Sequence, residues 1–164
     1  MITRLGALAA AAIALTASAN ALNDARPKYV KTPTGYLMVL RRGDDVIANL
    51  EKLAEQEKSA SLTGIGFLSD VTFGFFDFSK KEFQPKTFHD VEMAGMTGTI
   101  AWKDGKPSVH AHAAVAGPDF IAIGGHVLAA KVGPGSVEVS VVVHDKKLQR
   151  LVDPDIGANV LHLD

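Results

Sequence analysis

Residues 109–126 read VHAHAAVAGPDFIAIGGH and contain three of the six histidines of the chain. His110 and His112 lie two positions apart in an apolar run that is typical of a β-strand, so both imidazoles are expected on one face of that strand. The Gly-Pro-Asp sequence at 117–119 predicts a turn, after which the chain returns to His126. Neutral imidazoles are good zinc ligands, and three of them leave a fourth tetrahedral position for water or another ligand. The stretch therefore predicts a metal site built on strands.

The residues just before this stretch predict a β-hairpin. An apolar run from Met93 to Trp102 is followed by Lys-Asp-Gly-Lys at 103–106, and Asp-Gly between two apolar runs is a strong signal for a tight hairpin turn. The strand that ends at Trp102 is therefore expected to pair with a strand over Ser108–Val115. This pairing places the first two histidines in a paired strand and not on a loose loop.

One amphipathic helix is predicted near the start of the domain. Val46, Leu50 and Leu53 recur at helical spacing, with polar and charged residues between them. Asp44 is expected to cap the N-terminus of this helix, and the helical pattern continues to about Lys58. No comparable amphipathic helix is expected elsewhere in the chain.

The rest of the domain is predicted to form short strands separated by turn residues. The expected strands are Tyr36–Arg42, Leu62–Phe67, Val71–Phe78, Glu82–Phe88, Met93–Trp102, Ser108–Val115, Val127–Val132 and Ser136–Val143. Residues 79–81 and 133–135 are expected turns, and Pro85 predicts that its strand is an edge strand or contains a bulge. The four phenylalanines between 73 and 78 are expected in the core or in an interface.

These elements predict an α/β (α+β) fold with a largely antiparallel or mixed sheet of about seven strands and one main helix. One helix cannot cover both faces of a sheet of that size. The uncovered face must be buried either by curling of the sheet into a sandwich or by association with other copies of the chain. The residue pattern leaves both arrangements open.

Residues 1–21 have the pattern of a cleavable export signal. Arg4 provides a short positive region, LGALAAAAIAL at 5–15 provides the apolar region, and small residues allow cleavage near Ala19 or Ala21. The apolar run is shorter than the roughly 20 residues that span a bilayer, and no later segment is long and apolar enough to do so. We therefore expect a periplasmic or secreted protein that is not held in a membrane after cleavage.

Charge and cysteine content exclude several classes of function. The chain has 17 basic and 18 acidic residues, and loss of the leader with its single arginine leaves 16 basic and 18 acidic residues, a formal charge of −2. A nucleic-acid-binding surface instead needs a clustered basic face. The absence of cysteine excludes disulfides, a thiol nucleophile and a thiolate zinc site, so histidine and carboxylate are the remaining strong metal ligands.

Several short motifs occur in a fixed order between Tyr36 and Val143. They are Arg42-Gly43-Asp44-Asp45, Leu62-Thr63-Gly64-Ile65-Gly66, Met96-Thr97-Gly98-Thr99-Ile100, Asp104-Gly105-Lys106-Pro107, His110-x-His112 followed by Gly117, and Gly124-Gly125-His126-Val127-Leu128. In this combination the chain resembles the plants and prokaryotes conserved (PPC) domain family. The resemblance divides the mature chain into an N-terminal arm over 22–35, a PPC domain over 36–145 and a C-terminal tail over 146–164.

The resemblance implies a compact α/β fold and a homotrimer, because bacterial and archaeal PPC proteins assemble as trimers. It also implies that His110, His112 and His126 bind a metal, most simply zinc, as in some prokaryotic members. In plants the domain is joined to an AT-hook, a short basic segment that enters the minor groove of A·T-rich DNA. This chain contains no such segment, which disfavours a nucleic-acid partner.

The residues alone leave two interpretations of the histidines. His-x-His is common by chance, so spacing by itself favours three separate hydrogen-bonded histidines, whereas the family pattern favours one metal site. Asp119 is a candidate ligand or acceptor for a ligand ring, although Pro-Asp is typical of an ordinary turn. Glu92 and Glu138 are candidate general bases, although a solvated sheet face explains both. The other histidines, which lack partner spacing and are expected on the surface, are His89, His144 and His162.

Two functions of different classes fit these features. The first is a non-enzymatic, homotrimeric zinc-binding module, in which the metal and the subunit interface stabilise a domain without disulfides. The second is a zinc-dependent hydrolase or lyase that acts on a small molecule at the metal. The open fourth position favours the enzyme, and the lack of a convincing base or substrate-binding motif favours the module. We take the module as the main expectation, with DNA binding by family analogy as the third and least favoured function.

Overall fold

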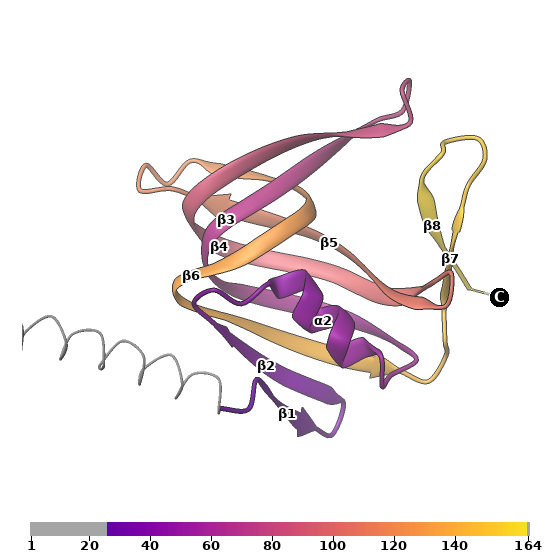
Figure 1. Ribbon diagram of the computed structural model, residues 1–164, viewed down its shortest axis with the longest axis horizontal. Helices are drawn as coiled ribbons and strands as arrows, with labels where there is room; N and C mark the ends of the chain where they lie inside the picture. Colours follow the sequence, from indigo (N-terminus) through magenta and orange to yellow (C-terminus); the bar gives the residue numbers. More distant parts are fainter. Residues whose placement is uncertain (1–25, 164) are drawn as a thin grey trace, which may run out of the picture.

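The computed structural model describes residues 26–163, in which eight strands form a single mixed sheet that one helix accompanies (Figure 1). The elements are β1 (Tyr29–Thr32), β2 (Gly35–Arg41), α2 (Val46–Ala54), β3 (Ser59–Asp77), β4 (Glu82–Lys103), β5 (Lys106–Ala116), β6 (Ala122–His144), β7 (Gln149–Val152) and β8 (Asn159–His162). The expected fold class, with one main helix and a largely antiparallel sheet, is confirmed. The export signal expected at 1–21 lies outside the described residues. Within 26–163, no helix has the length and apolar character that a membrane span requires.

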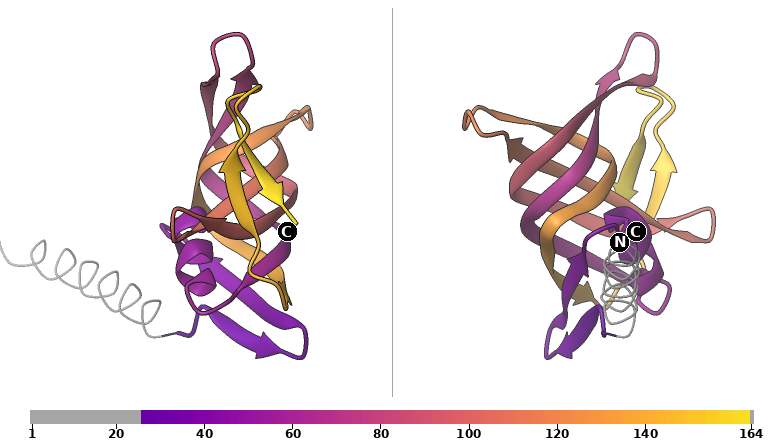
Figure 2. Two further views of the ribbon diagram at one scale, coloured as in Figure 1. Left: turned by 90° about the vertical axis from the view of Figure 1, so that its right-hand side faces the viewer. Right: turned by 60° about the vertical axis from the view of Figure 1, so that its left-hand side comes forward.

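Four long strands close into a ring. β3 pairs with β4 on one edge and β6 on the other, and β5 also pairs with both β4 and β6. The sheet therefore curls into a barrel-like body, which Figure 2 shows from two further sides. Curling, one of the two arrangements that the sequence leaves open, buries the inner face of the sheet within one chain.

Six of the expected strands are halves of three long ones. β3 runs through the expected break at 68–70, β4 through 89–92, and β6 through 133–135, which was expected to be a turn and is not. The register between β3 and β6 shifts between Gly66 and Leu68, opposite the Gly-Pro-Gly sequence of β6. Bulges bend a strand without ending it, so these turn-type residues mark the bends of the curled sheet.

Both short hairpin turns that the sequence predicts next to β4 are present. Asp104 and Gly105 have φ angles of 52° and 78°, as a tight turn that matches the twist of the strands requires, and they join β4 to β5. Residues 79–81 join β3 to β4. Pro85 lies in the part of β4 that pairs with β3 alone, so its expected edge position is confirmed.

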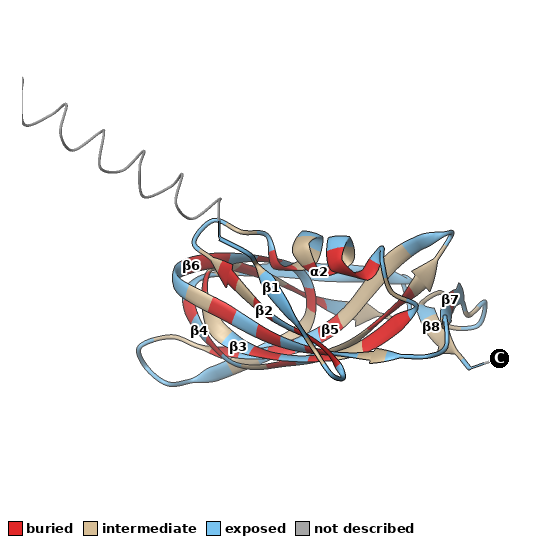
Figure 3. Cartoon of the chain, turned by 90° about the horizontal axis from the view of Figure 1, so that it is seen from below, coloured by how far each residue is buried: buried red, intermediate tan, exposed pale blue. Residues whose placement is uncertain are grey.

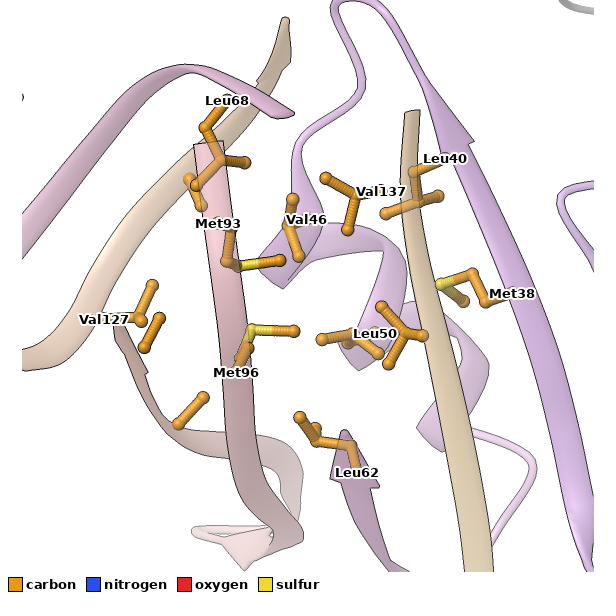
Figure 4. Packing of buried hydrophobic residues seen from close by; sticks show 14 of the residues in the cluster. Met38, Leu40, Val46, Leu50, Leu62, Leu68, Met93, Met96, Val127 and Val137 are labelled. Atoms are coloured by element: carbon orange, nitrogen blue, oxygen red, sulfur yellow. The ribbon is translucent and has the colours of Figure 1, made fainter. Parts of the chain in front are cut away.

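The core lies between α2 and the inner face of the curled sheet. In Figure 3 the buried residues of α2 face the sheet, and in Figure 4 Leu50 points among side chains of several strands, including Met38 and Met96. Leu50 is 0% exposed. Four alternate valines of β6 share one face of the strand; Val143 at its end is half-buried, and the other three are buried: Val137, Val139 and Val141. Period-two burial on the strands and a single apolar stripe on the helix therefore meet in one core.

The helix starts one residue later than expected and ends four residues earlier. Asp45 is the N-cap, because its carboxylate accepts the Ala48 N–H at 2.9 Å. The Asp44 carboxylate instead accepts the Arg41 N–H at 2.9 Å and the Lys28 ammonium at 2.7 Å. After Ala54 the chain turns at 55–58 and enters β3, whose pairing with β6 begins at Ser59.

Both ends of the domain are ordered against its sheet. Residues 29–32, within the expected N-terminal arm, form β1 and pair with β2. In the expected tail, β7 and β8 form a hairpin that is anchored next to the end of β4. The Trp102 N–H donates to the Leu148 carbonyl at 2.9 Å, and the Leu148 N–H donates to Ser59 Oγ at 2.8 Å. The tail thus docks on its own chain.

We expect Leu50→Ala to lower the free energy of unfolding by about 2–5 kcal/mol, because it leaves a cavity between α2 and the sheet. Lys52→Ala, on the exposed side of the same helix, is the matched control and should change stability by less than about 0.5 kcal/mol. Urea unfolding followed by the fluorescence of the single tryptophan measures both variants. Equal losses in the two variants would contradict this assignment of the core.

A second prediction concerns acid stability. Burial raises the pKa of Asp44, but the Arg41 N–H and the Lys28 ammonium outweigh burial and hold this pKa below its ordinary value of 3.8. Such a carboxylate stabilises the fold above its unfolded pKa, and the contribution disappears as the pH falls through the folded pKa. The stability difference between wild type and Asp44→Asn should therefore shrink between about pH 6 and about pH 2, as measured by urea unfolding. A difference that stays constant over this range would show that the carboxylate charge has no such role.

Candidate metal centre

β5 and β6 present three histidines on one face of the sheet. His110 and His112 leave the outer face of β5, while Ala111 and Ala113 beside them are buried in the core. The antiparallel register places His126 of β6 directly opposite His112. One possible ligand atom from each ring lies within 4.8 Å of the other two. The structure thus brings together the three histidines that the sequence singles out.

A glycine next to the site allows β5 and β6 to lie close together. Gly124 pairs with Ala114, and a Cβ atom at position 124 would lie 2.4 Å from the carbonyl oxygen of Ala113. No side chain can occupy that distance, so this position of the Gly-Gly-His motif requires glycine. The glycine of this motif therefore allows β5 and β6 to lie close together, and the close pairing places His126, the last residue of the motif, next to β5.

The geometry and the ligand chemistry fit zinc. The Nε2 atoms of His110 and His112 are 3.3 Å apart. Zinc–nitrogen bonds of about 2.0–2.1 Å in a tetrahedron place two ligand nitrogens about 3.3 Å from each other. The wider limit of 4.8 Å for the whole set means that one ring has to turn inward to complete it. Within 26–163 no carboxylate joins this cluster, so these residues leave one tetrahedral position for another ligand.

The two less exposed rings are held neutral. Burial, together with the charges of His110, His112 and Arg150, lowers the pKa of His126 to about 4. Burial, together with Arg150 and His112, also lowers the pKa of His110. Both rings are therefore neutral at pH 7, the state in which an imidazole nitrogen can bind a metal.

Arg150 of β7 lies behind His110, and nothing in the sequence pattern of the tail points to it. Its side chain is 4% exposed, and burial lowers the pKa of its guanidinium. One terminal nitrogen lies 3.3 Å from His110 Nδ1, and the other donates to Thr99 Oγ1 at 2.6 Å. Its Nε has no partner, and no carboxylate of residues 26–163 forms a salt bridge with it.

These contacts assign the proton positions of the histidine pair. A guanidinium has only donors, so Nδ1 of His110 must accept from Arg150, which leaves the ring proton on Nε2. That proton then donates to Nε2 of His112. A neutral His110 that binds a metal at Nε2 would carry its proton on Nδ1, so Nδ1 could no longer accept from Arg150 and the guanidinium would have a second donor without a partner.

The cluster opens into a cleft of about 530 Å³. Its walls come from the β3–β4 hairpin and the β7–β8 hairpin, which stand side by side in Figures 1 and 2. The Lys81 ammonium donates to the Pro154 carbonyl at 3.0 Å and so joins the two hairpins. The Phe83 ring stacks on His126, with 4.7 Å between the ring centroids. The three histidines therefore lie in a cleft between two hairpins and not on an open sheet surface.

The phenylalanines expected in the core are divided between core and cleft. Phe73 is buried, as expected. Phe75, Phe76 and Phe78 instead line the cleft, and Phe75 is 75% exposed. Sequence alone could not separate these roles, because the bulges of β3 change which residues face inward.

The other candidate residues lie away from the cluster. Asp119 accepts the Ile121 N–H at 3.1 Å and is a turn residue. Glu92 and Glu138 are exposed and do not line the cleft. His89 contacts Asp70 at 2.7 Å, and His144 and His162 are also outside the cluster. Among the described residues, no carboxylate therefore stands beside the three histidines.

A sequence model described as the Plants and Prokaryotes Conserved (PCC) domain matches residues 27–144. The chain belongs to this family. It is the family introduced above under the abbreviation PPC. The match covers β1 to β6 and includes all three clustered histidines of the PCC domain. It ends before β7, so Arg150 and one wall of the cleft come from outside the matched region.

Solved structures support the same membership. A protein from Ralstonia eutropha JMP134, named as a proposed DNA-binding protein, shares 60% identity, with a TM-score of 0.81 over 84% of this chain and 96% of that one. A metal-containing protein from Archaeoglobus fulgidus shares 26% identity, with a TM-score of 0.69 over 82% and 98% of the two chains. A proposed DNA-binding protein from Bacteroides thetaiotaomicron also shares 26%, with a TM-score of 0.76 over 82% and 95%. No curated protein gave a significant match.

We expect His126 of the metal-depleted PCC protein to remain neutral until about pH 4, because burial and its neighbours disfavour its charged form. An NMR titration of the imidazole nitrogens measures this directly. The unfolded chain takes up this proton first, so the contribution of the neutral ring to stability falls as the pH drops from 6.5 toward about 4. Urea-unfolded protein is the control and should titrate near the ordinary histidine value. Titration of folded His126 at that ordinary value would contradict the described burial.

Proposed function

We propose that this PCC domain is a zinc-binding module that acts as an exported homotrimer. The observation that carries the proposal is the set of three imidazoles with ligand atoms within 4.8 Å of one another, beside a cleft. The chain has no cysteine, so imidazole nitrogen is the ligand type that the site offers to a borderline metal such as zinc. The description of the Archaeoglobus relative as metal-containing supports the same conclusion.

The residues around the proposed zinc site have different roles. His110, His112 and His126 would hold the ion, and Phe83 fixes the orientation of the His126 ring by stacking on it. A zinc ion with three imidazole ligands supplies a Lewis-acidic position for a fourth ligand. The phenylalanines of the β3–β4 hairpin line that side of the cleft with apolar surface.

Export and assembly rest on separate features. The pattern of residues 1–21 supports export through the inner membrane to the periplasm or beyond. The resemblance to trimeric relatives supports a homotrimer. Exposed apolar side chains at the turn before β6 also favour a subunit contact, since Phe120 is 87% exposed and Ile121 follows it.

A second candidate is a zinc-dependent enzyme, a hydrolase or lyase that acts on a small molecule. The cleft of about 530 Å³ favours it, because that volume lies within the range of small-molecule sites. No aspartate or glutamate lines the cleft, so the described residues provide no carboxylate as a general base. This absence keeps the module ahead of the enzyme.

DNA binding is the third candidate and takes support only from the names of the Ralstonia and Bacteroides relatives. The formal charge of this chain is −1, whereas DNA binding depends on phosphate contacts from a basic surface. The cleft is lined by phenylalanines and contains a single formally charged side chain. We therefore rank this function below the other two.

The test is the zinc content of the mature protein, purified without a histidine tag and then dialysed against zinc. We expect one zinc per chain in wild type and none in the variant His110→Ala/His112→Ala/His126→Ala. The matched control is His89→Ala/His144→Ala/His162→Ala, which removes the other three histidines and should keep the metal. Wild type without zinc after dialysis, or equal loss in both variants, would overturn the proposal.

Oligomer size and melting temperature of the same samples separate a structural zinc from one that binds ligands. The histidines lie on the face of β5 opposite the core, so we expect the fold to survive removal of the metal. A trimer that dissociates together with zinc loss would instead assign the ion to the subunit interface. Retention of the trimer would direct attention to the cleft.

A further inference from the structure

We infer that the cleft binds a small organic carboxylate with an apolar body, and that Arg150 receives the carboxylate group. The inference rests on the proposed zinc centre as a neighbour and names the class of ligand that the same site takes. Four features of the described chain lead to it: an unpaired buried cation, the charge of the cleft, its aromatic wall and the origin of the arginine.

The Arg150 guanidinium is a buried positive charge without a negative partner. Its side chain is 4% exposed, and its hydrogen bonds go to a threonine and a neutral imidazole. No carboxylate in residues 26–163 pairs with it, and Nε lacks any acceptor. Buried charges in proteins are normally paired, because desolvation of an isolated ion is costly. Because Arg150 lines the cleft, an anion that enters the cleft would supply the missing negative charge beside the guanidinium.

The cleft is positive and contains no competing acid. Arg150 is its single formally charged lining residue, and the polar residues Ser108 and Asn159 are neutral. Zinc at the three histidines would add further positive charge at the same side. A neutral or cationic ligand would leave this charge uncompensated, so the cleft selects for an anion.

The aromatic wall selects against a bare inorganic anion. Phe75, Phe76, Phe78 and Phe83 line the cleft, and Phe75 and Phe78 are mostly exposed to solvent. A ligand with a flat or apolar body would bury this surface and gain hydrophobic stabilisation. A planar carboxylate also matches the fork of a guanidinium better than a tetrahedral phosphate matches a single arginine.

The arginine comes from a segment outside the family match. β7 follows residue 144, where the PCC match ends, and the β7–β8 hairpin provides both Arg150 and residues 156–159 of the cleft wall. The matched domain thus provides the histidines, and the C-terminal hairpin provides the guanidinium that binds the charged group of the ligand. Ligand selection is a property of this added hairpin.

The test uses isothermal titration calorimetry on the full mature chain after zinc loading, with sodium benzoate as the probe. Benzamide has the same shape without the charge, acetate has the charge without the ring, and inorganic phosphate tests the tetrahedral anion. We expect benzoate to bind more tightly than each of the three. Because this comparison uses wild type alone, it does not depend on the folding of a variant.

The variant Arg150→Gln should weaken benzoate binding by roughly tenfold or more, the usual effect of losing a charge-assisted hydrogen bond. Its zinc content should not fall, because the substitution removes the donor that holds the His110 proton on the metal-binding nitrogen. Arg42→Gln is the matched control, because it removes the same charge from an exposed position outside the cleft and should leave benzoate binding unchanged. Circular dichroism checks that both variants fold.

Each outcome bears on one of the two proposals. If zinc binds but benzoate does not, or if benzamide binds as tightly as benzoate, the carboxylate inference is wrong and the metal centre stands. If benzoate binds Arg150→Gln as tightly as wild type, Arg150 is not the receiving group. If wild type takes no zinc yet binds benzoate in an Arg150-dependent way, the metal centre is wrong and the anion site stands.

Discussion

β5 pairs with β4 along one edge and with β6 along the other, and this double pairing closes the curled sheet. The closed ring encloses an apolar interior that one helix can complete, so a sheet of eight strands is buried without a second sheet. The same pairing fixes His112 opposite His126. A shift of one residue in this register would turn the histidines toward the core, so the fold and the site depend on one alignment.

The chemistry of the site follows from which face of β5 carries each residue. Small apolar side chains, Ala111 and Ala113, face inward, and the imidazoles face outward beneath two hairpins that shield them partly from water. Partial burial keeps His110 and His126 neutral, whereas Arg150 keeps its charge in the same surroundings. The site therefore combines metal-binding nitrogens with a cation that lacks an internal partner. A bound metal ion and this unpaired guanidinium would both favour a negatively charged ligand in the cleft.

The sequence allowed prediction of the local elements and of the histidine set, because both depend on short-range patterns. Asp104-Gly105 correctly predicts a hairpin, and the helical spacing from Val46 to Leu53 correctly predicts the helix. Long strands were divided wrongly, because the glycines and the proline at 133–135 form a bulge in β6 and not a turn. Arg150 was missed altogether, since its role depends on where the C-terminal hairpin docks, and no local pattern encodes that contact. Long-range docking and strand bending are thus the parts that required the structure.

X-ray absorption at the zinc edge on the zinc-loaded wild-type protein tests the central claim most directly. The account predicts a four-coordinate ion with three imidazole nitrogens at about 2.0–2.1 Å and one additional oxygen or nitrogen ligand. The multiple-scattering pattern of imidazole identifies these rings without reference to activity. A spectrum with oxygen ligands alone, or one that is unchanged when the three histidines of β5 and β6 are replaced by alanine, would contradict the proposed metal centre.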